Sequence, residues 1–227
     1  MKRKNPLVEG QTYHIFTRSI AEFKIFNNDS DFQRMLYLLQ YYQIQEPPIS
    51  FSVYTRLEKV QQEGFEKCFS LIAKDQLQIV QIIAYCLMPT HIHLILKQLQ
   101  PSGISIFLGN VLNSYTRYFN IKHHRKGPLW ESKFQNVLVE NDEQLLHLTR
   151  YIHLNPTTAS LVKKPHDWKF SSYKEYLNEK TNYHLCQFED LIEFRPDKYK
   201  KFVQDRIAYQ RELAIIKRQL IDGESKP

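Results

Sequence analysis

Cysteine and long apolar runs are scarce in this sequence of 227 residues. The cysteines, Cys68, Cys86 and Cys186, are odd in number and far apart, which argues against a disulfide framework and against a cysteine metal site. No run approaches the ~20 apolar residues of a transmembrane helix. The basic N-terminus, MKRKNPLVEGQTYH, lacks the apolar stretch of a secretory signal. These absences predict a cytoplasmic protein that does not enter a membrane.

Positive charge and aromatic side chains are, in contrast, plentiful. The formal net charge is +7, and 13% of the residues are aromatic. A basic protein often binds a polyanion, and nucleic acid is the first candidate. The apolar content of 42% is sufficient for a core, and the length fits one domain or one domain with an appendage.

Hydrophobic spacing and turn residues predict an alternation of strands and helices. Ser30 and Gln33 fit a capping box before one helix, and Asn141 is the expected cap of a later helix that Pro156 should end. Residues 56–67 fit either a helix or a mobile loop. The predicted strands are 12–20 and 129–140, and the predicted helices are 31–45, 101–121, 142–154, one within 166–177, and 196–221.

The apolar stretch 77–97 has two interpretations. It forms either one strand with a break near Pro89 or two paired strands joined by a turn at MPT. The element order predicts an α+β domain with an antiparallel sheet, helices on one face, and His91 and His93 on the other. We assign this domain to residues 1–180 and a helical C-terminal extension to 181–227.

The stretch CLMPTHIHLILK, residues 86–97, places two imidazoles in an apolar strand. Side chains alternate between the faces of a strand, so His91 and His93 point the same way, with Cβ atoms roughly 6.5 Å apart. Both could therefore reach one metal ion or one phosphate. The alternative is a pair of half-exposed histidines at a sheet edge.

A histidine pair is an incomplete metal site, because catalytic sites usually have about three protein ligands and an open position. The best source of a third ligand is the helix that ends in RYIHLNP. Tyr151 and Asn155 lie four residues apart on one face of that helix, and the Asn155 amide oxygen can bind a hard divalent cation. The Tyr151 phenol would lie beside the metal, although an ordinary core aromatic is the alternative. His147 is a weaker candidate, and His153 faces elsewhere.

Basic and aromatic residues are interleaved in NSYTRYFNIKHHRKGPLW, residues 113–130. Cations together with stacking aromatics suit single-stranded or hairpin DNA, whereas a solvated helix end is the alternative. The candidate DNA-binding residues are Arg18, Arg117, Lys122, Arg125, Lys126, Trp130 and Lys133.

Five motifs follow one another along the chain: YHIFTRSI, CLMPTHIHLILK, NSYTRYFN, GPLWESKF and YIHLNP. In this order and at these distances they resemble the single-tyrosine HUH transposases, in particular the REP-associated tyrosine transposases. DWKFSSYKEYL resembles a later segment of that family. The resemblance covers about residues 11–177 and implies a ferredoxin-like fold. Residues 50–76 look like an insertion, and 184–227 match no part of the family.

The resemblance implies an enzyme that cleaves and rejoins DNA through a covalent 5′-phosphotyrosine intermediate. His91 and His93 carry over as ligands of a divalent metal. Tyr151 carries over as the nucleophile, and Asn155 as the third ligand. The family suggests magnesium or manganese, although the ligand types alone also permit zinc. The expected partner is DNA, bound by a monomer or a homodimer.

Two other functions stay open on the residues alone. The first is a metal-dependent nuclease in which water attacks the phosphodiester and Tyr151 only positions it. The second is a domesticated DNA-binding protein without catalytic activity. A covalent adduct with DNA would exclude both, and the absence of any strand cleavage with metal present would favour the second.

Overall fold

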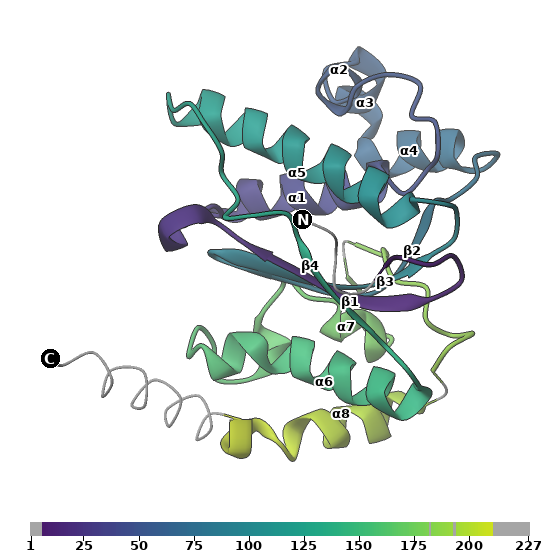
Figure 1. Ribbon diagram of the computed structural model, residues 1–227, viewed down its shortest axis with the longest axis vertical. Helices are drawn as coiled ribbons and strands as arrows, with labels where there is room; N and C mark the ends of the chain where they lie inside the picture. The colour runs from purple at the N-terminus through teal and green to yellow at the C-terminus, as the bar shows by residue number, and fades with distance from the viewer. Residues whose placement is uncertain (1–5, 182, 193, 211–227) are drawn as a thin grey trace, which may run out of the picture.

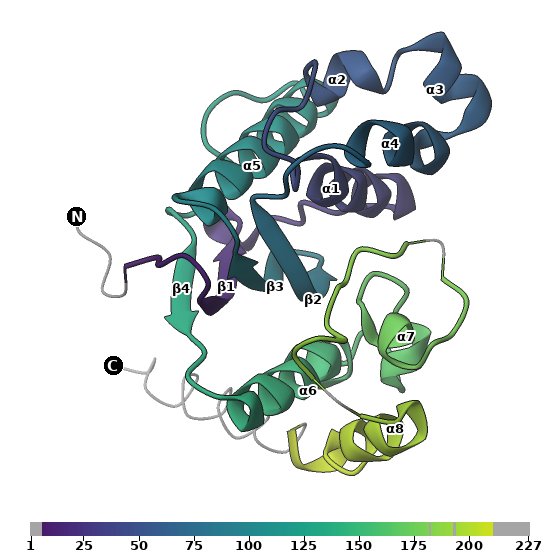
Figure 2. The same cartoon turned by 90° about the vertical axis from the view of Figure 1, so that its right-hand side faces the viewer.

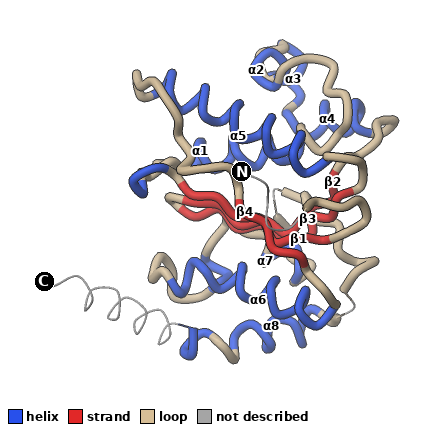
Figure 3. The backbone as a smooth tube through the Cα atoms, viewed as in Figure 1, coloured by secondary structure: helices blue, strands red, loops and turns tan. Residues whose placement is uncertain are grey.

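A four-stranded sheet lies at the centre of the computed structural model, which describes residues 6–181, 183–192 and 194–210 (Figure 1). All its neighbouring strands are antiparallel, in the order β2-β3-β1-β4. Figure 3 shows helices on either side of this sheet. The predicted α+β class with an antiparallel sheet is confirmed. The strands are β1 (Thr12–Arg18), β2 (Val80–Met88), β3 (His91–Gln98) and β4 (Gln135–Leu138).

The apolar stretch 77–97 forms two paired strands, which confirms the second of its two interpretations. Residues 89–90 form the turn between them. Pro89 is tolerated here because a turn residue does not have to donate a backbone N–H to the strand ladder, and proline has none to donate. Its carbonyl oxygen accepts hydrogen bonds from the backbone N–H groups of Ile25 and Phe26, at 2.9 and 3.3 Å. These bonds tie the turn to the segment that precedes α1 (Asp29–Tyr41).

Alternation along the strands gives the sheet two chemically different faces. Ile15 of β1 and Leu94 of β3 point into a core shared with α1 and α5 (Gly103–Lys122). Residues 50–76 add helices to this layer and are mostly helical (Figures 1 and 2). The added helices are α2 (Phe51–Tyr54), α3 (Glu58–Glu63) and α4 (Phe65–Ala73).

The opposite face of the sheet has a helical layer that the sequence analysis did not predict. Figure 2 shows α6 (Asp142–Thr158) and α7 (Tyr173–Tyr176) below the sheet, with α8 (Pro196–Gln204) beyond α6. Ile83 and Cys86 of β2 share a second core with Leu145 and Ile152 of α6. The histidines of β3 therefore face α6, and they do not lie on an open sheet face.

Two helix ends differ from their predicted positions. Asn28 is the N-cap of α1, since its side-chain oxygen accepts from the Asp31 N–H at 3.1 Å, and Ser30 lies inside the helix. Asn141 caps α6 as predicted, by accepting from the Gln144 N–H. Pro156 does not end α6, because it lies buried near the C-terminus, where its missing N–H removes one hydrogen bond from the helix.

The predicted elements around 129–140 and 166–177 are shorter in the structure. Only 135–138 form a strand, and Trp130 keeps a single isolated bridge to Ser19 while its indole N–H donates to Thr116 of α5. Trp168 donates to the Leu87 carbonyl at the edge of β2, which leaves a 3-10 turn (Pro165–Asp167) and the short α7. The predicted helix 196–221 begins as α8, and its residues 211–221 lie outside the described part. Within that part, no helix is long and apolar enough to cross a membrane.

His153 is structural, as its position on α6 suggested. Its Nδ1 lies 2.7 Å from the Tyr199 hydroxyl of α8, and its Nε2 lies 2.8 Å from Ser172 Oγ. The Tyr199 hydroxyl donates to Thr149 Oγ1 at 2.9 Å. Burial lowers the pKa of His153 to about 3, so the ring stays neutral and links α6, α8 and the start of α7.

Gly103, the first residue of α5, should not tolerate a side chain. A Cβ atom built there would lie 2.2 Å from the backbone oxygen of Ile79, which is far inside contact distance. We expect Gly103→Ala to lower the free energy of unfolding by about 1–3 kcal/mol in urea denaturation. Gly109→Ala is the matched control, because nothing lies within 4 Å and alanine favours the helix by up to about 1 kcal/mol. Equal stability of the two variants would contradict this packing.

Candidate catalytic site

The two histidines of β3 lie on the face of the sheet that α6 covers. In the antiparallel pairing of β1 with β3, Phe16 lies opposite His93 and Arg18 lies opposite His91. The rings of His91 and His93 have centroids 5.1 Å apart and are nearly perpendicular, at 87°. The structure thus brings the two imidazoles together as the strand alternation predicted.

A third histidine, His14 of β1, contacts His93 and was not among the residues predicted for the site. Its Nε2 lies 3.1 Å from Nδ1 of His93, and the two rings stack with centroids 5.4 Å apart. In the motif YHIF, His14 alternates with the buried Tyr13 and Ile15, and this alternation indicates that His14 faces the other side of the sheet. Without the register of β1 against β3, however, no partner could be assigned to it.

Burial keeps all three imidazoles neutral near pH 7. It lowers the pKa of His14 and of His91 to about 4 and the pKa of His93 well below its ordinary value. The positive charge of Arg18 lowers the pKa of His91 further. Neutral imidazoles can bind a cation without first losing a proton.

The hydrogen bonds of the pair leave one ring nitrogen of each histidine open. Nδ1 of His91 lies 3.0 Å from Thr90 Oγ1, and Nδ1 of His93 is bonded to His14. When these Nδ1 atoms carry the protons, each Nε2 keeps a lone pair for a metal ion. Neither Nε2 has a hydrogen-bond partner among the residues that the structure describes.

Tyr151 of α6 projects toward the histidines. Its ring meets His93 edge-on with centroids 5.9 Å apart, and it meets His14 edge-on at 6.2 Å. The side chain is nevertheless 42% exposed, so a substrate can approach it. Partial burial raises the pKa of the Tyr151 phenol, so the phenol is protonated near neutral pH.

Asn155 follows Tyr151 by one helical turn. Its side-chain Nδ2 is buried and has no hydrogen-bond partner within the described residues. An amide without a partner can still bind an additional ligand. If the amide is flipped, its oxygen takes the place of Nδ2 and can face a cation. No three His, Cys, Asp or Glu side chains in the described ranges form a ready metal site. The donor set available is therefore two imidazoles, with the Asn155 amide as the candidate third ligand.

Two other tyrosines that could compete as nucleophiles are engaged elsewhere. Tyr115 is fully buried and donates its hydroxyl to the Ile25 carbonyl at 2.5 Å. Tyr118 donates to the carboxylate of Asp31 at 2.7 Å. Both lie on α5, on the other side of the sheet from Tyr151 (Figure 1).

The candidate DNA-binding residues are spread over two faces of the molecule. Arg18 lies beside His91 and faces Glu131 at 3.9 Å, with more than half of its side chain exposed. Arg117 and Lys122 line a cavity on the α5 side. Lys126 and Lys133 are exposed.

Arg125 and Trp130 are built into the end of α5. Arg125 donates to the Asn120 side chain at 3.0 Å and to the Pro128 carbonyl at 2.9 Å. The Trp130 indole N–H donates to Thr116 Oγ1 at 3.1 Å. Replacement of either residue would therefore disturb the loop as well as any contact with DNA.

Comparisons with known proteins agree with this arrangement. The family model of IS200-like transposases matches residues 53–155, a range that includes both histidines of β3, Tyr151 and Asn155. A protein of Haemophilus influenzae assigned to the REP-associated tyrosine transposases is 25% identical over 103 residues. This match spans 41% of the present chain and 58% of that relative. These findings confirm the family resemblance.

The fold also resembles that of a solved REP-associated tyrosine transposase. That structure, which was determined with a bound REP hairpin, superimposes with a TM-score of 0.51. The superposition covers 86% of this chain and 94% of the other, at 16% sequence identity. At this identity the likeness concerns the fold alone.

The bond between His14 and His93 makes a prediction about tautomers. If His14 accepts from His93, the His93 ring carries its proton on Nδ1, and His14→Ala removes the acceptor. We expect the Nδ1–H tautomer of His93 to lose about threefold to tenfold in relative population, as the loss of one hydrogen bond implies. Nitrogen-15 chemical shifts of the labelled imidazoles measure this ratio.

His14→Gln is the control for this experiment, because the glutamine amide oxygen can still accept. It should preserve the tautomer ratio, and circular dichroism should show that both variants are folded. An Nε2–H tautomer of His93 in the unaltered protein would reverse the assigned direction of the bond.

Proposed function

We propose that this protein is a transposase that cleaves and rejoins a DNA strand through Tyr151, with a divalent metal held by His91 and His93. The observation that carries the proposal is the convergence of two neutral imidazoles and one accessible phenol at a single point of the sheet. The similarity to IS200-like and REP-associated tyrosine transposases supports the same reaction class. The related structure with a REP hairpin supports DNA as the substrate.

The residues present suit a divalent cation. His91 and His93 would hold it through Nε2, and the amide of Asn155 would supply an oxygen. Imidazole and amide ligation does not select strongly among divalent metals, and we propose magnesium or manganese by analogy with the family. When bound, such a cation would supply Lewis-acid polarisation of a phosphodiester.

Tyr151 performs the bond exchange. Its phenolic oxygen attacks phosphorus, the P–O3′ bond breaks, and the departing strand takes up a proton to end in a 3′-OH. The 5′-phosphate remains on Tyr151 as a phosphotyrosine, which a 3′-OH can later attack in the reverse direction. The bond energy is conserved in this ester, so rejoining needs no external energy source.

Arg18 has a suitable position to bind the substrate. It lies opposite His91 at the end of β1, and its positive charge already acts on the histidine rings. The carboxylate of Glu131 is 3.9 Å away and both side chains are largely exposed, so this ion pair is weak and exchangeable. A DNA phosphate can replace Glu131 as the partner of Arg18.

A nuclease that uses water as the nucleophile is the second candidate. One observation favours it, which is that burial raises the pKa of the Tyr151 phenol and so makes ionisation harder. The two mechanisms differ in their product, because only attack by tyrosine leaves DNA covalently attached to the protein.

Tyr151→Phe should abolish cleavage and leave binding of DNA unchanged. The substitution removes only the hydroxyl, so the edge-on contacts of the ring with His14 and His93 survive. With end-labelled single-stranded DNA and manganese, denaturing electrophoresis should show an adduct for the unaltered protein and none for the variant. Peptide mapping should place the adduct on Tyr151.

Tyr209→Phe is the matched control and should still cleave, because the Tyr209 side chain is exposed after α8, where its ring packs against Arg206. Full cleavage by Tyr151→Phe would reject the phosphotyrosine mechanism and favour attack by water.

His91→Ala combined with His93→Ala should abolish binding of manganese in calorimetric titration. Both open Nε2 atoms are lost, and Asn155 alone provides too few ligands for a stable site. His147→Ala is the control, since His147 lies against Arg150 and Phe202 on the outer side of α6. Unchanged affinity of the double variant, with its fold verified by circular dichroism, would place the metal elsewhere.

A further inference from the structure

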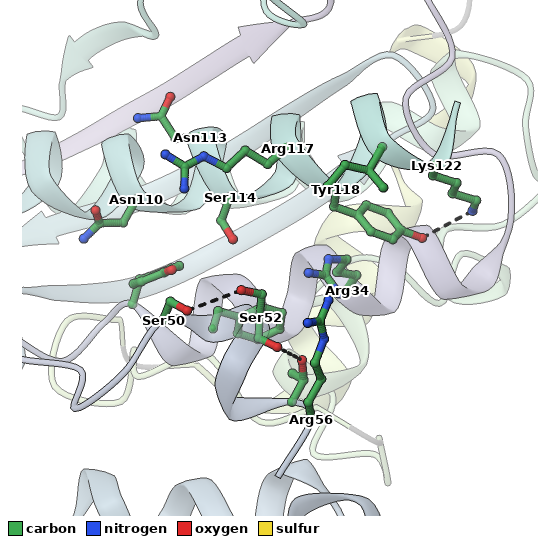
Figure 4. A pocket seen from close by; sticks show the side chains of 14 residues that line it. Arg34, Ser50, Ser52, Arg56, Asn110, Asn113, Ser114, Arg117, Tyr118 and Lys122 are labelled. Atoms are coloured by element: carbon green, nitrogen blue, oxygen red, sulfur yellow. Dashed lines mark hydrogen bonds between the residues drawn. The ribbon is translucent and has the colours of Figure 1, made fainter. Parts of the chain in front are cut away.

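A cavity of about 500 Å³ lies between α1, α2 and α5 (Figure 4). These helices cover the face of the sheet opposite α6 (Figure 1). The cavity's volume is within the roughly 300–1,000 Å³ that is usual for small-ligand sites. Three arginines from different segments line it: Arg34 of α1, Arg56 after α2, and Arg117 of α5. The proposed chemistry at Tyr151 does not use these side chains.

The positive charge in this cavity is not compensated. No Asp or Glu is among its lining residues. Lys122, at one end, is neutralised by Asp31, whose Oδ1 lies 2.6 Å from its Nζ. Within the described residues none of the three arginines has a carboxylate partner, and Nε of Arg34 is buried without any hydrogen bond. An uncompensated cluster of this kind is suited to an external anion.

Aromatic rings hold Arg34 in place. Its guanidinium carbon lies 4.3 Å from the centroid of Tyr118 and 5.1 Å from that of Phe51. Figure 4 shows Arg34 between Tyr118 and Arg56. These cation–π contacts use no N–H donor, and the buried Nε has no hydrogen-bond partner within the described residues. The donors of Arg34 are therefore available to a ligand.

The remaining lining residues are mostly small and polar. Asn110, Asn113 and Ser114 follow α5 along one wall, and Ser50 and Ser52 lie on the other (Figure 4). Amides and hydroxyls can donate to and accept from the edge of a base or a sugar oxygen. The cavity therefore combines cations for a phosphate with neutral groups for the rest of a nucleotide.

We propose that this cavity binds a phosphodiester of the DNA strand, with one nucleotide inside it, as a second DNA contact on the far side of the sheet from Tyr151. The inference rests on the proposed function, because that function supplies the DNA. Arg34, Arg56 and Arg117 bind the phosphate. Occupancy of the cavity fixes the position of the strand and takes no part in bond cleavage.

The chain itself marks a path between the two sites. Residues 122–131 lead from the end of α5 round the end of the sheet, where the Glu131 N–H donates to the Arg18 carbonyl at 3.0 Å. Lys126 is exposed on this segment, and Arg18 lies at its far end beside His91. A strand that follows these cations reaches both the cavity and the catalytic face.

The test measures DNA binding in the Tyr151→Phe background without metal, so that cleavage plays no part. Arg56→Gln and Arg117→Gln, each at an exposed side chain, should each weaken binding of a labelled single strand about tenfold. Each should also flatten the salt dependence by about 0.7 log units per log of salt. Lys198→Gln removes an exposed cation from α8 and should change neither quantity.

A second measurement guards against misfolding of the variants. Phenylglyoxal modifies accessible arginines. Mass spectrometry identifies the modified arginines in the Tyr151→Phe protein, in which every arginine is retained. DNA should protect Arg56 and Arg117 from modification and should leave Arg195 of the outer face reactive.

The outcomes separate this inference from the proposed function. Normal DNA binding with unchanged salt slopes and no protection would overturn the cavity assignment and leave the catalytic proposal intact. Protection by inorganic phosphate or a mononucleotide, and none by DNA, would overturn it in favour of a small-molecule anion site. Failure to bind any DNA would overturn both.

Discussion

The register between β1 and β3 is the constraint on which the candidate catalytic site depends. Phe16 lies opposite His93, so the side chains of His14, His91 and His93 all project from one face. A slip of one residue would move the β3 histidines to the face covered by α1 and α5 and would bury their ring nitrogens in an apolar core. The apolar residues between the histidines prevent this, because Ile92 and Leu94 are fully buried against those helices. Core packing thus fixes the positions of the polar site.

Burial of the same face determines the charge state of the site. Neutral imidazoles repel an incoming cation less than protonated ones would, whereas a neutral phenol is a weak nucleophile. Burial lowers the pKa of the histidines and raises that of Tyr151, so both groups are uncharged near neutral pH. In the proposed mechanism, this uncharged state receives a cation and a phosphodiester together.

The sequence predicted the proximity of the two β3 histidines better than it predicted the layers around them. Strand alternation places His91 and His93 together, and helical spacing places Tyr151 and Asn155 on one face, because both periodicities are local. The role of His14 and the helical layer under the sheet depend on contacts between distant segments. α6 continues past its predicted end for a similar reason, because burial near the helix end outweighs the local preference of Pro156. The three arginines of the cavity, Arg34, Arg56 and Arg117, are far apart in the sequence, so neither strand nor helix periodicity predicts that they lie together.

One buried carboxylate divides the cations of the α5 side into two groups. Burial alone would raise the pKa of Asp31, but hydrogen bonds from Lys122 and Tyr118 outweigh it and hold the pKa below its ordinary value. Asp31 therefore stays ionised and neutralises Lys122. The hydroxyl of Tyr118 is fixed by the same carboxylate, and the Tyr118 ring in turn supports the guanidinium of Arg34. Asp31 thus supports Arg34 through the Tyr118 ring, while its own ion pair is with Lys122. The charge of Arg34 therefore remains in the cavity, although a carboxylate lies close to its edge.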